Sequence, residues 1–193
     1  MDNPQVAISD AEVPRAAQPI FQHLLDTYAS ETNKTTSIWK ELRDEQLGYR
    51  PDPKSSTVRE ILVHQLLSER RFFAEFIGLE EPAAALILPA GESPPVAAYI
   101  SRYVTLARPR LAALAAGDEA FWLSPVPFFD VTRERIWVFW RRVLHTAHHR
   151  AQVGVYLRLL ADRVPATYGP TADVTWAGAD PTRTVAAAER LGG

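Results

Sequence analysis

The segment LHTAHHRAQ carries three histidines, His145, His148 and His149. Imidazole is a frequent metal ligand in proteins, and residues four apart on a helix lie on one face about one turn from each other. His145 and His149 have this spacing and can bind one metal ion together. His148 points roughly a quarter turn away from His149, so we expect it to face a different partner or solvent.

Spacing alone is weak support for a metal site, because histidines four apart also occur at helix surfaces and in cores. His64 strengthens the interpretation, because it lies in the middle of a second amphipathic segment. Ile61, Ser68 and the pair Arg71/Phe72 fall on the same side of that segment, at helical spacings of three and four. A metal site shared between two helices is therefore the favoured interpretation.

Several classes of function are excluded or disfavoured by composition. The chain has no cysteine, which excludes disulfides, thiolate ligands and cysteine nucleophiles. Thr146 stands where an HExxH metalloprotease needs its general-base glutamate. The formal net charge of −2 provides no field that would attract nucleic acid or an anionic membrane. Without a membrane-length apolar run or a signal-peptide pattern, we expect a cytoplasmic protein.

The polar residues around the histidines have two interpretations each. Glu60 precedes His64 by one turn and either orients it as a second-shell carboxylate or caps the helix. Arg150 and Gln152 either bind an anion or cosubstrate or form an interhelical bond, and we favour the bond. Glu69 is about 140° around the helix from His64 and is expected to form a salt bridge or to pack between helices.

Aromatic residues and arginines are concentrated towards the end of the chain. Trp137 and Trp140 lie within two turns of His145, so they could wall the metal pocket with Phe128 or Phe129, or pack in the core. The segment FWLSPVPFFD is expected to be a loop that lines a pocket or association surface, or that covers the core. A solvated or dimer-facing surface is expected for the arginines of the last helix, namely Arg133, Arg135, Arg141, Arg142, Arg158 and Arg163.

Apolar residues recur at helical spacing in four segments, at about 16–46, 57–77, 95–116 and 132–163. Ser56 or Thr57 is the expected N-cap of the second helix, and Gly78 its stop. Pro109 is expected to kink or split the third helix. The apolar set expected to face the core from the last helix is Ile136, Phe139/Trp140, Val143, Ala147, Ala151, Val155 and Leu159.

These segments predict an all-α fold, an antiparallel four-helix bundle without a convincing strand. At 193 residues the chain has the length of one domain, with a core at about 16–173. The tail, residues 174–193, is expected to wrap the bundle, with Trp176 as its anchor.

The sequence resembles the DinB/YfiT-like metalloprotein superfamily. His64 and Glu69 in HQLLSE match its pattern, as do His145, His149, Arg150 and Gln152 in HxxxHRxQ. The stretches EQLGYRPDPKSSTVREILVHQLLSE and VPATYGPTAD are similar to its members as well. The resemblance implies a bundle with an up-up-down-down connection, often dimeric. It also implies His64, His145 and His149 as ligands of a divalent metal ion, zinc or nickel, with open or water-filled positions.

The resemblance further implies a metal-dependent transferase or isomerase that uses a low-molecular-weight thiol such as bacillithiol, mycothiol or glutathione. The metal would bind the sulfur and lower its pKa for attack on an electrophile. Two alternatives stay open. One is a non-catalytic dimeric metalloprotein or stress-related binding module, and the other is a bundle without metal.

Overall fold

The computed structural model describes residues 7–174 and shows the predicted helical bundle. Its long helices are α1 (Gln22–Trp39), α2 (Val58–Arg71), α3 (Val96–Ala115) and α5 (Arg135–Leu159). A π-helical turn, Phe72–Ile77, continues α2. The shorter elements are α4 (Glu119–Leu123), β1 (Pro125–Phe128), β2 (Val131–Glu134) and the 3-10 turns Asp10–Glu12, Pro19–Phe21, Asp44–Gly48 and Ala84–Leu86.

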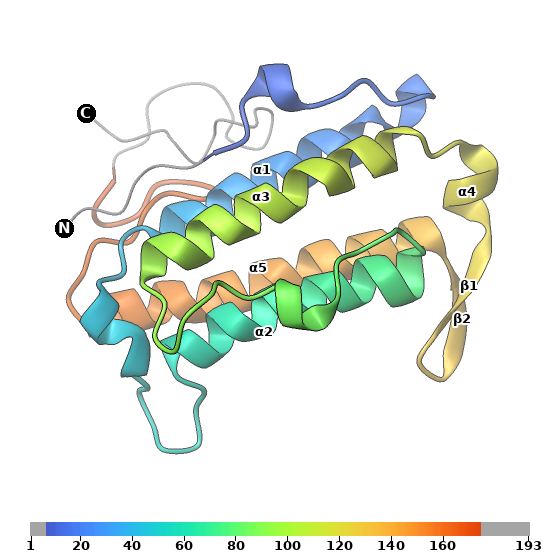
Figure 1. Ribbon diagram of the computed structural model, residues 1–193. Helices are drawn as coiled ribbons and strands as arrows, with labels where there is room; N and C mark the ends of the chain where they lie inside the picture. The colour runs from blue at the N-terminus through green and yellow to red at the C-terminus, as the bar shows by residue number, and fades with distance from the viewer. Residues whose placement is uncertain (1–6, 175–193) are drawn as a thin grey trace.

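The helices pack in pairs, α1 beside α3 and α2 beside α5 (Figure 1). The colours of Figure 1 show that α1 and α5 run in one direction, whereas α2 and α3 run in the other. Residues 79–95 run back along the bundle so that α3 starts at the same end as α2. The up-up-down-down order implied by the resemblance is therefore wrong, because the first connection already reverses the chain.

The first helix is shorter than predicted. We expected a helix over about 16–46, but α1 ends at Trp39 and Asp44–Gly48 forms a separate 3-10 turn. Arg43 is extended before that turn, and its backbone N–H donates to Gln46 Oε1 at 2.8 Å. This local capping bond favours a new turn over continuation of the helix.

The second helix has the predicted ends. Thr57, not Ser56, is the N-cap: its hydroxyl accepts the Glu60 N–H, and Glu60 Oε2 accepts the Thr57 N–H at 2.7 Å. The π-helical turn then carries the chain to Ile77, and Gly78 ends it with a φ of +83°. Only glycine adopts this left-handed conformation without steric cost.

The predicted split of the third helix does not occur, because α3 continues through Pro109 to Ala115. Pro109 is exposed and lies inside the helix, which does not end at it. The apolar residues predicted to face the core from this helix are buried, among them Ile100, Val104 and Leu111.

A β-hairpin lies where the sequence indicated only a loop. β1 and β2 pair antiparallel with Phe128 opposite Val131, which leaves Phe129 and Asp130 as a two-residue turn. Because residues 131–134 are extended, α5 begins at Arg135 and not at 132. Strands of four residues, one of them containing two prolines, give too short an alternation to be recognised in a sequence.

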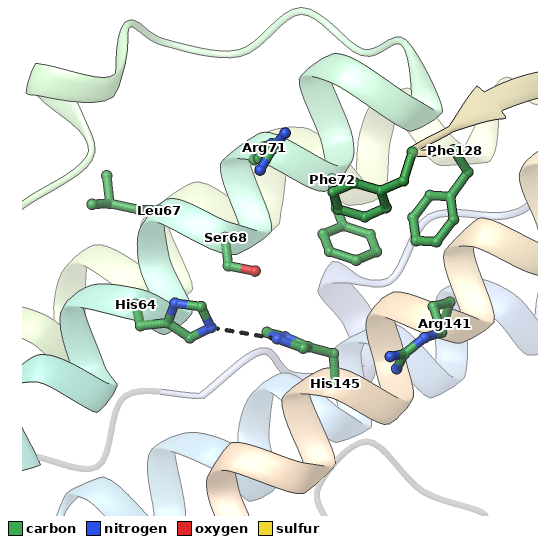
Figure 2. Close-up of a pocket in the computed structure, with 9 residues that line it drawn as sticks. His64, Leu67, Ser68, Arg71, Phe72, Phe128, Arg141 and His145 are labelled. Carbon is green, nitrogen blue, oxygen red and sulfur yellow. Dashed lines mark hydrogen bonds between the residues drawn. The ribbon is translucent and has the colours of Figure 1, made fainter. Parts of the chain in front are cut away.

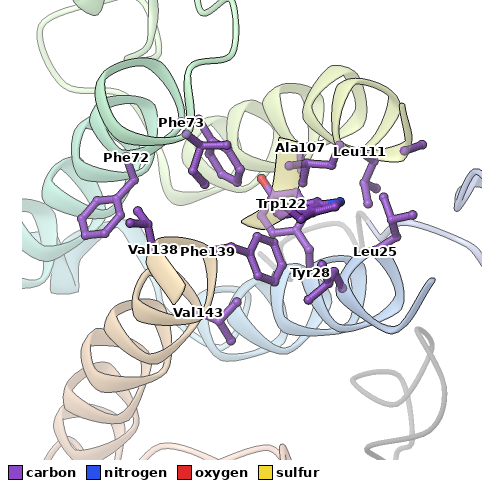
Figure 3. Packing of buried hydrophobic residues seen from close by; sticks show 14 of the residues in the cluster. Leu25, Tyr28, Phe72, Phe73, Ala107, Leu111, Trp122, Val138, Phe139 and Val143 are labelled. Carbon is purple, nitrogen blue, oxygen red and sulfur yellow. The ribbon is translucent and has the colours of Figure 1, made fainter. Parts of the chain in front are cut away.

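Two buried clusters form the core. The cluster at the hairpin end of the bundle combines residues of α1, α3, α5 and the π-helical turn with Trp122 of α4, and Figure 3 shows Phe73, Trp122 and Phe139 packed within it. The other cluster lies around Trp39, Leu62 and Ile100. Within residues 7–174, no helix is both long enough and apolar enough to cross a membrane.

The predicted core face of the last helix is wrong in its C-terminal half. Val155 and Leu159 are 57% and 59% exposed. The apolar residues buried there are instead Val153, Tyr156 and Leu157. Arg142, Thr146 and Arg150 of the same helix are buried as well, so the inner face of α5 mixes polar and apolar residues. The predicted anchor Trp176 lies outside the described residues.

Candidate metal centre

Three histidine side chains from two helices converge between α2 and α5. His145 Nε2 lies 3.4 Å from His64 Nε2 and 3.2 Å from His149 Nε2. All three candidate ligand atoms lie within 4.8 Å of one another. Ligand atoms arranged tetrahedrally about 2.0–2.1 Å from zinc stand about 3.3–3.4 Å apart. The spacing of the imidazoles therefore fits one divalent ion, and these residues could hold it.

His149 is oriented for ligation by a neighbour on its own helix. Its Nδ1 lies 2.7 Å from Gln152 Oε1, and an amide oxygen only accepts hydrogen bonds. His149 Nδ1 therefore carries the proton, and the lone pair of Nε2 faces the other two rings. A hydrogen bond of this kind fixes the tautomer and orientation of metal-binding histidines.

The Nδ1 atom of His145 has Arg142 as its partner, and this favours the opposite tautomer from that of His149. Its Nδ1 lies 2.9 Å from Arg142 Nη1, and a guanidinium only donates. In this arrangement His145 Nδ1 accepts, so the proton of the neutral ring sits on Nε2, towards the other histidines. Ligation through Nε2 would displace that proton and require Arg142 to release Nδ1.

The three candidate ligands are held in the neutral form. Burial and the neighbouring Arg142 guanidinium lower the pKa of His145 to about 3. Burial also lowers the pKa values of His64 and His149, although the Gln152 hydrogen bond partly opposes this for His149. Neutral imidazoles are the form that binds metal ions, so the triad does not have to lose three charges first.

Behind the triad, a buried ion network crosses the bundle. Glu69 Oε2 accepts from Arg142 at 2.9 Å, and Glu69 Oε1 accepts from Arg110 at 3.0 Å and from the Tyr28 hydroxyl at 2.5 Å. Burial raises the pKa of Glu69, but the neighbouring guanidiniums of Arg142 and Arg110 together have a larger effect in the opposite direction. The pKa of Glu69 therefore lies below its ordinary value. Glu69 thus forms the predicted salt bridge, and Arg142 is buried rather than on the predicted surface.

A pocket of about 530 Å³ opens beside His64 and His145. Figure 2 shows the two histidines at one end and the rings of Phe72 and Phe128 at the other. The remaining lining residues are Leu67, Ser68, Arg71, Phe129 and Arg141. A ligand that reaches the triad from this side would contact both aromatic and cationic side chains.

Two of the predicted second-shell residues have structural roles away from the triad. Glu60 is exposed and accepts the Thr57 N–H, which is the capping alternative. Arg150 is buried and pairs with Glu31 of α1 at 2.7 Å, which is the favoured interhelical bond. Gln152 departs from that expectation, because it bonds His149 on its own helix.

The aromatic candidates are divided between the pocket and the core. Phe128 and Phe129 line the pocket. Trp137 packs edge-on against Phe128 with ring centroids 5.4 Å apart, behind the pocket wall. Trp140 stacks on His23 at 6.1 Å and borders the core. Neither tryptophan is among the residues that line the pocket.

Sequence reasoning did not assign the pocket residues Leu67, Arg71 and Arg141 or the Arg142 contact to the site. Helical spacing gave a partial indication. Arg141 lies four residues before His145, and Ser68 lies four residues after His64, so each shares a helix face with its histidine. His148 is exposed and lies outside the triad, in agreement with its predicted exclusion.

The fold and the site together define a four-helix bundle with a histidine triad between its second and last long helices. The sequence profile of the DinB superfamily matches residues 27–153, which include all three histidines. The chain belongs to the DinB superfamily.

Two solved structures share this fold. A DinB-like protein from Bacillus cereus ATCC 10987 is 21% identical, with a TM-score of 0.60 over 75% of this chain and 95% of that one. A DinB-like protein from Bacillus subtilis, YjoA, is 16% identical, with a TM-score of 0.58 over 76% and 97%. No curated protein matched the chain.

Replacing Glu69 tests the buried network. The Glu69→Gln variant should lose about 3–5 kcal/mol in its free energy of unfolding, because the buried Arg142 guanidinium loses its carboxylate partner, whereas Arg110 keeps its ion pair with Glu81. Glu75→Gln is the matched control, because Glu75 forms an exposed ion pair with Arg71 on the same helical segment and should cost about 1 kcal/mol or less. Urea titration measures both, and equal losses would contradict the assigned role.

The lowered histidine pKa values predict a pH dependence of stability. As the pH falls below about 6.5 the unfolded chain takes up protons, whereas His145 in the folded chain takes up its proton only near pH 3. The free energy of unfolding should therefore decrease from pH 7 to pH 5.

Urea titration of the chelator-treated protein measures this, and His145→Asn should show a smaller decrease than the wild type. The control is His148→Asn, because the His148 ring is exposed. Carboxylates with lowered pKa values, Glu31 and Glu69, add to the loss only below about pH 4.5. If the free energy of unfolding of His145→Asn fell with pH as steeply as that of the wild type, the lowered pKa assigned to His145 would be refuted.

Proposed function

We propose that this protein binds one divalent metal ion, zinc or nickel, through His64, His145 and His149. The observation that carries the proposal is the convergence of three imidazoles with lowered pKa values from two helices. Membership of the DinB superfamily supports it. Three nitrogen ligands are typical of sites that leave a coordination position for a further ligand.

We further propose a metal-dependent transferase or isomerase reaction with a low-molecular-weight thiol as cosubstrate. A bound divalent ion supplies Lewis acidity that stabilises a thiolate at neutral pH. The chain has no cysteine, so the sulfur would come from the cosubstrate. The pocket beside His64 and His145 gives room for thiol and electrophile on the open side of the triad.

The chain's own residues would bind and orient the reactants. His64 is exposed, whereas His145 and His149 are half-buried, so access to the triad is from the α2 side. The Ser68 hydroxyl lines the pocket and accepts a hydrogen bond from Arg142, so its own proton is available for a polar group of a ligand. Phe72 and Phe128 exclude water from the far end of the pocket.

Metal binding is tested by elemental analysis after loading with zinc or nickel. About one ion per chain is expected for the wild type and for His148→Ala, and much less for His64→Ala, His145→Ala and His149→Ala. The melting temperature of the wild type should rise with metal and fall with chelator, because the ion binds only the folded state. A wild type without metal would end this proposal.

Catalysis is tested on the same set of proteins. Turnover of bacillithiol, mycothiol or glutathione with a fluorogenic bimane electrophile should require metal and should be lost in His149→Ala but kept in His148→Ala. Stoichiometric metal without turnover of any thiol would instead favour the second candidate function.

That second candidate is a non-catalytic dimeric metalloprotein or stress-related binding module. The observation that favours a homodimer is an exposed apolar stripe on α5. Leu144, Val155 and Leu159 are 62%, 57% and 59% exposed and lie along one side of this helix. Exposed apolar residues along one helix face are typical of association sites, and a dimer is compatible with either function.

Light scattering tests the homodimer. The wild type should have the mass of two chains, and Leu159→Glu should shift the protein towards one chain, because a charge buried at an interface is unfavourable. Leu86→Glu is the matched control, because Leu86 is 62% exposed, close to the 59% of Leu159, but lies on the connection between α2 and α3. A monomeric wild type would refute the dimer.

A further inference from the structure

The pocket beside the triad combines an apolar wall with positive charge. Phe72, Phe128 and Phe129 line one end, and the guanidiniums of Arg71 and Arg141 belong to the same lining. No carboxylate is among the lining residues. A pocket with aromatic rings and cationic side chains complements a ligand with an apolar body and a negative charge.

Arg141 has the more available of the two charges. Within residues 7–174 it forms no ion pair or hydrogen bond, and it lies one turn before His145 on α5. Arg71 is paired with Glu75 at 2.9 Å and stacks over the rings of Phe76 and Phe129. Figure 2 shows Arg71 on α2 and Arg141 on α5, so the helices that carry the histidines also carry the cations.

Phe129 is held over the same pocket by an unfavourable backbone conformation. It has a φ of +54° at the first position of the hairpin turn, a place where glycine is preferred. Its side chain is 63% exposed, yet it packs against Phe76 and Phe128 at 5.1 and 4.9 Å between ring centroids. A large exposed aromatic residue at a strained turn is typical of a functional position.

The hairpin is fixed at its base, which keeps Phe129 at the pocket. Arg135 at the start of α5 donates to the Ile77 carbonyl at 2.9 Å and to the Phe121 carbonyl at 3.1 Å. These bonds tie the hairpin to the end of the π-helical turn and to α4. The Phe129 ring is therefore part of a preformed wall.

We propose that this pocket binds a small organic carboxylate with an aromatic or bulky apolar body. The body packs against Phe72, Phe128 and Phe129, and the carboxylate pairs with Arg141. This inference rests on the proposed function, because this organic carboxylate would be the electrophile that reacts at the histidine triad. Arg141 and the phenylalanines are not metal ligands, so carboxylate recognition can be measured with or without metal.

Calorimetric titration with 3-phenylpropionate and its neutral analogue 3-phenylpropionamide tests the proposal. The wild type should bind the carboxylate about tenfold or more tightly than the amide, the effect of one charge-assisted contact. Arg141→Gln should remove this preference. The control Arg102→Gln makes the same change of charge on α3, outside the pocket, and should keep it.

Phe129→Gly tests the aromatic wall separately. Glycine relieves the turn, so the variant should fold at least as stably as the wild type but bind both probes several-fold more weakly, because it loses the ring contact. Unchanged binding of both probes by Phe129→Gly would overturn the role of the wall.

Chelator-treated wild type separates this proposal from the metal proposal. A preference for the carboxylate that survives chelation and disappears in Arg141→Gln supports recognition by Arg141, whatever the metal content. A preference that survives in Arg141→Gln, or is absent from the wild type, overturns it. A preference lost on chelation alone would assign the carboxylate to the metal and also overturn it. Elemental analysis shows separately whether the protein binds metal, so failure of the metal proposal can be told apart from failure of this one.

Discussion

One buried carboxylate connects all four long helices. Glu69 of α2 accepts hydrogen bonds from Tyr28 of α1, Arg110 of α3 and Arg142 of α5. Glu69 and both arginines are at most 2% exposed, and buried charges are tolerated only when they are paired and hydrogen-bonded. The relative positions of α2 and α5 are therefore restricted by this network, and these two helices carry the histidines.

The same network reaches the candidate metal ligands through Arg142. This side chain bonds Glu69 with one nitrogen and His145 and Ser68 with the other. Its donor-only chemistry sets the His145 tautomer, whereas Gln152 sets the opposite tautomer in His149. His145 and His149 would therefore start metal binding from different tautomers. The hydrogen bond from Arg142 to His145 Nδ1 is the contact that would have to change.

The pocket is completed by elements that lie outside the bundle proper. The π-helical turn places Phe72 over the cavity, and the hairpin adds Phe128 and Phe129 from the other side. Arg135 holds the two together through the Ile77 carbonyl. The bundle supplies the candidate metal ligands, and these additions supply the surface that would select a ligand.

The sequence by itself determined the helical bundle and the approximate positions of its long helices, because helical periodicity is a local property. It also predicted His145 and His149 as a pair from their four-residue spacing, and His64 as their partner from its place in a second amphipathic segment. It also identified Gly78 as a stop and Thr57 as one of two caps. The tertiary structure alone decided that Arg142 and Arg150 face inward while Val155 and Leu159 face solvent. Only it placed Arg141, Phe72 and Phe129 around one pocket, since such contacts depend on how distant segments pack. A buried arginine resembles an exposed one in sequence, because its partner lies on another helix.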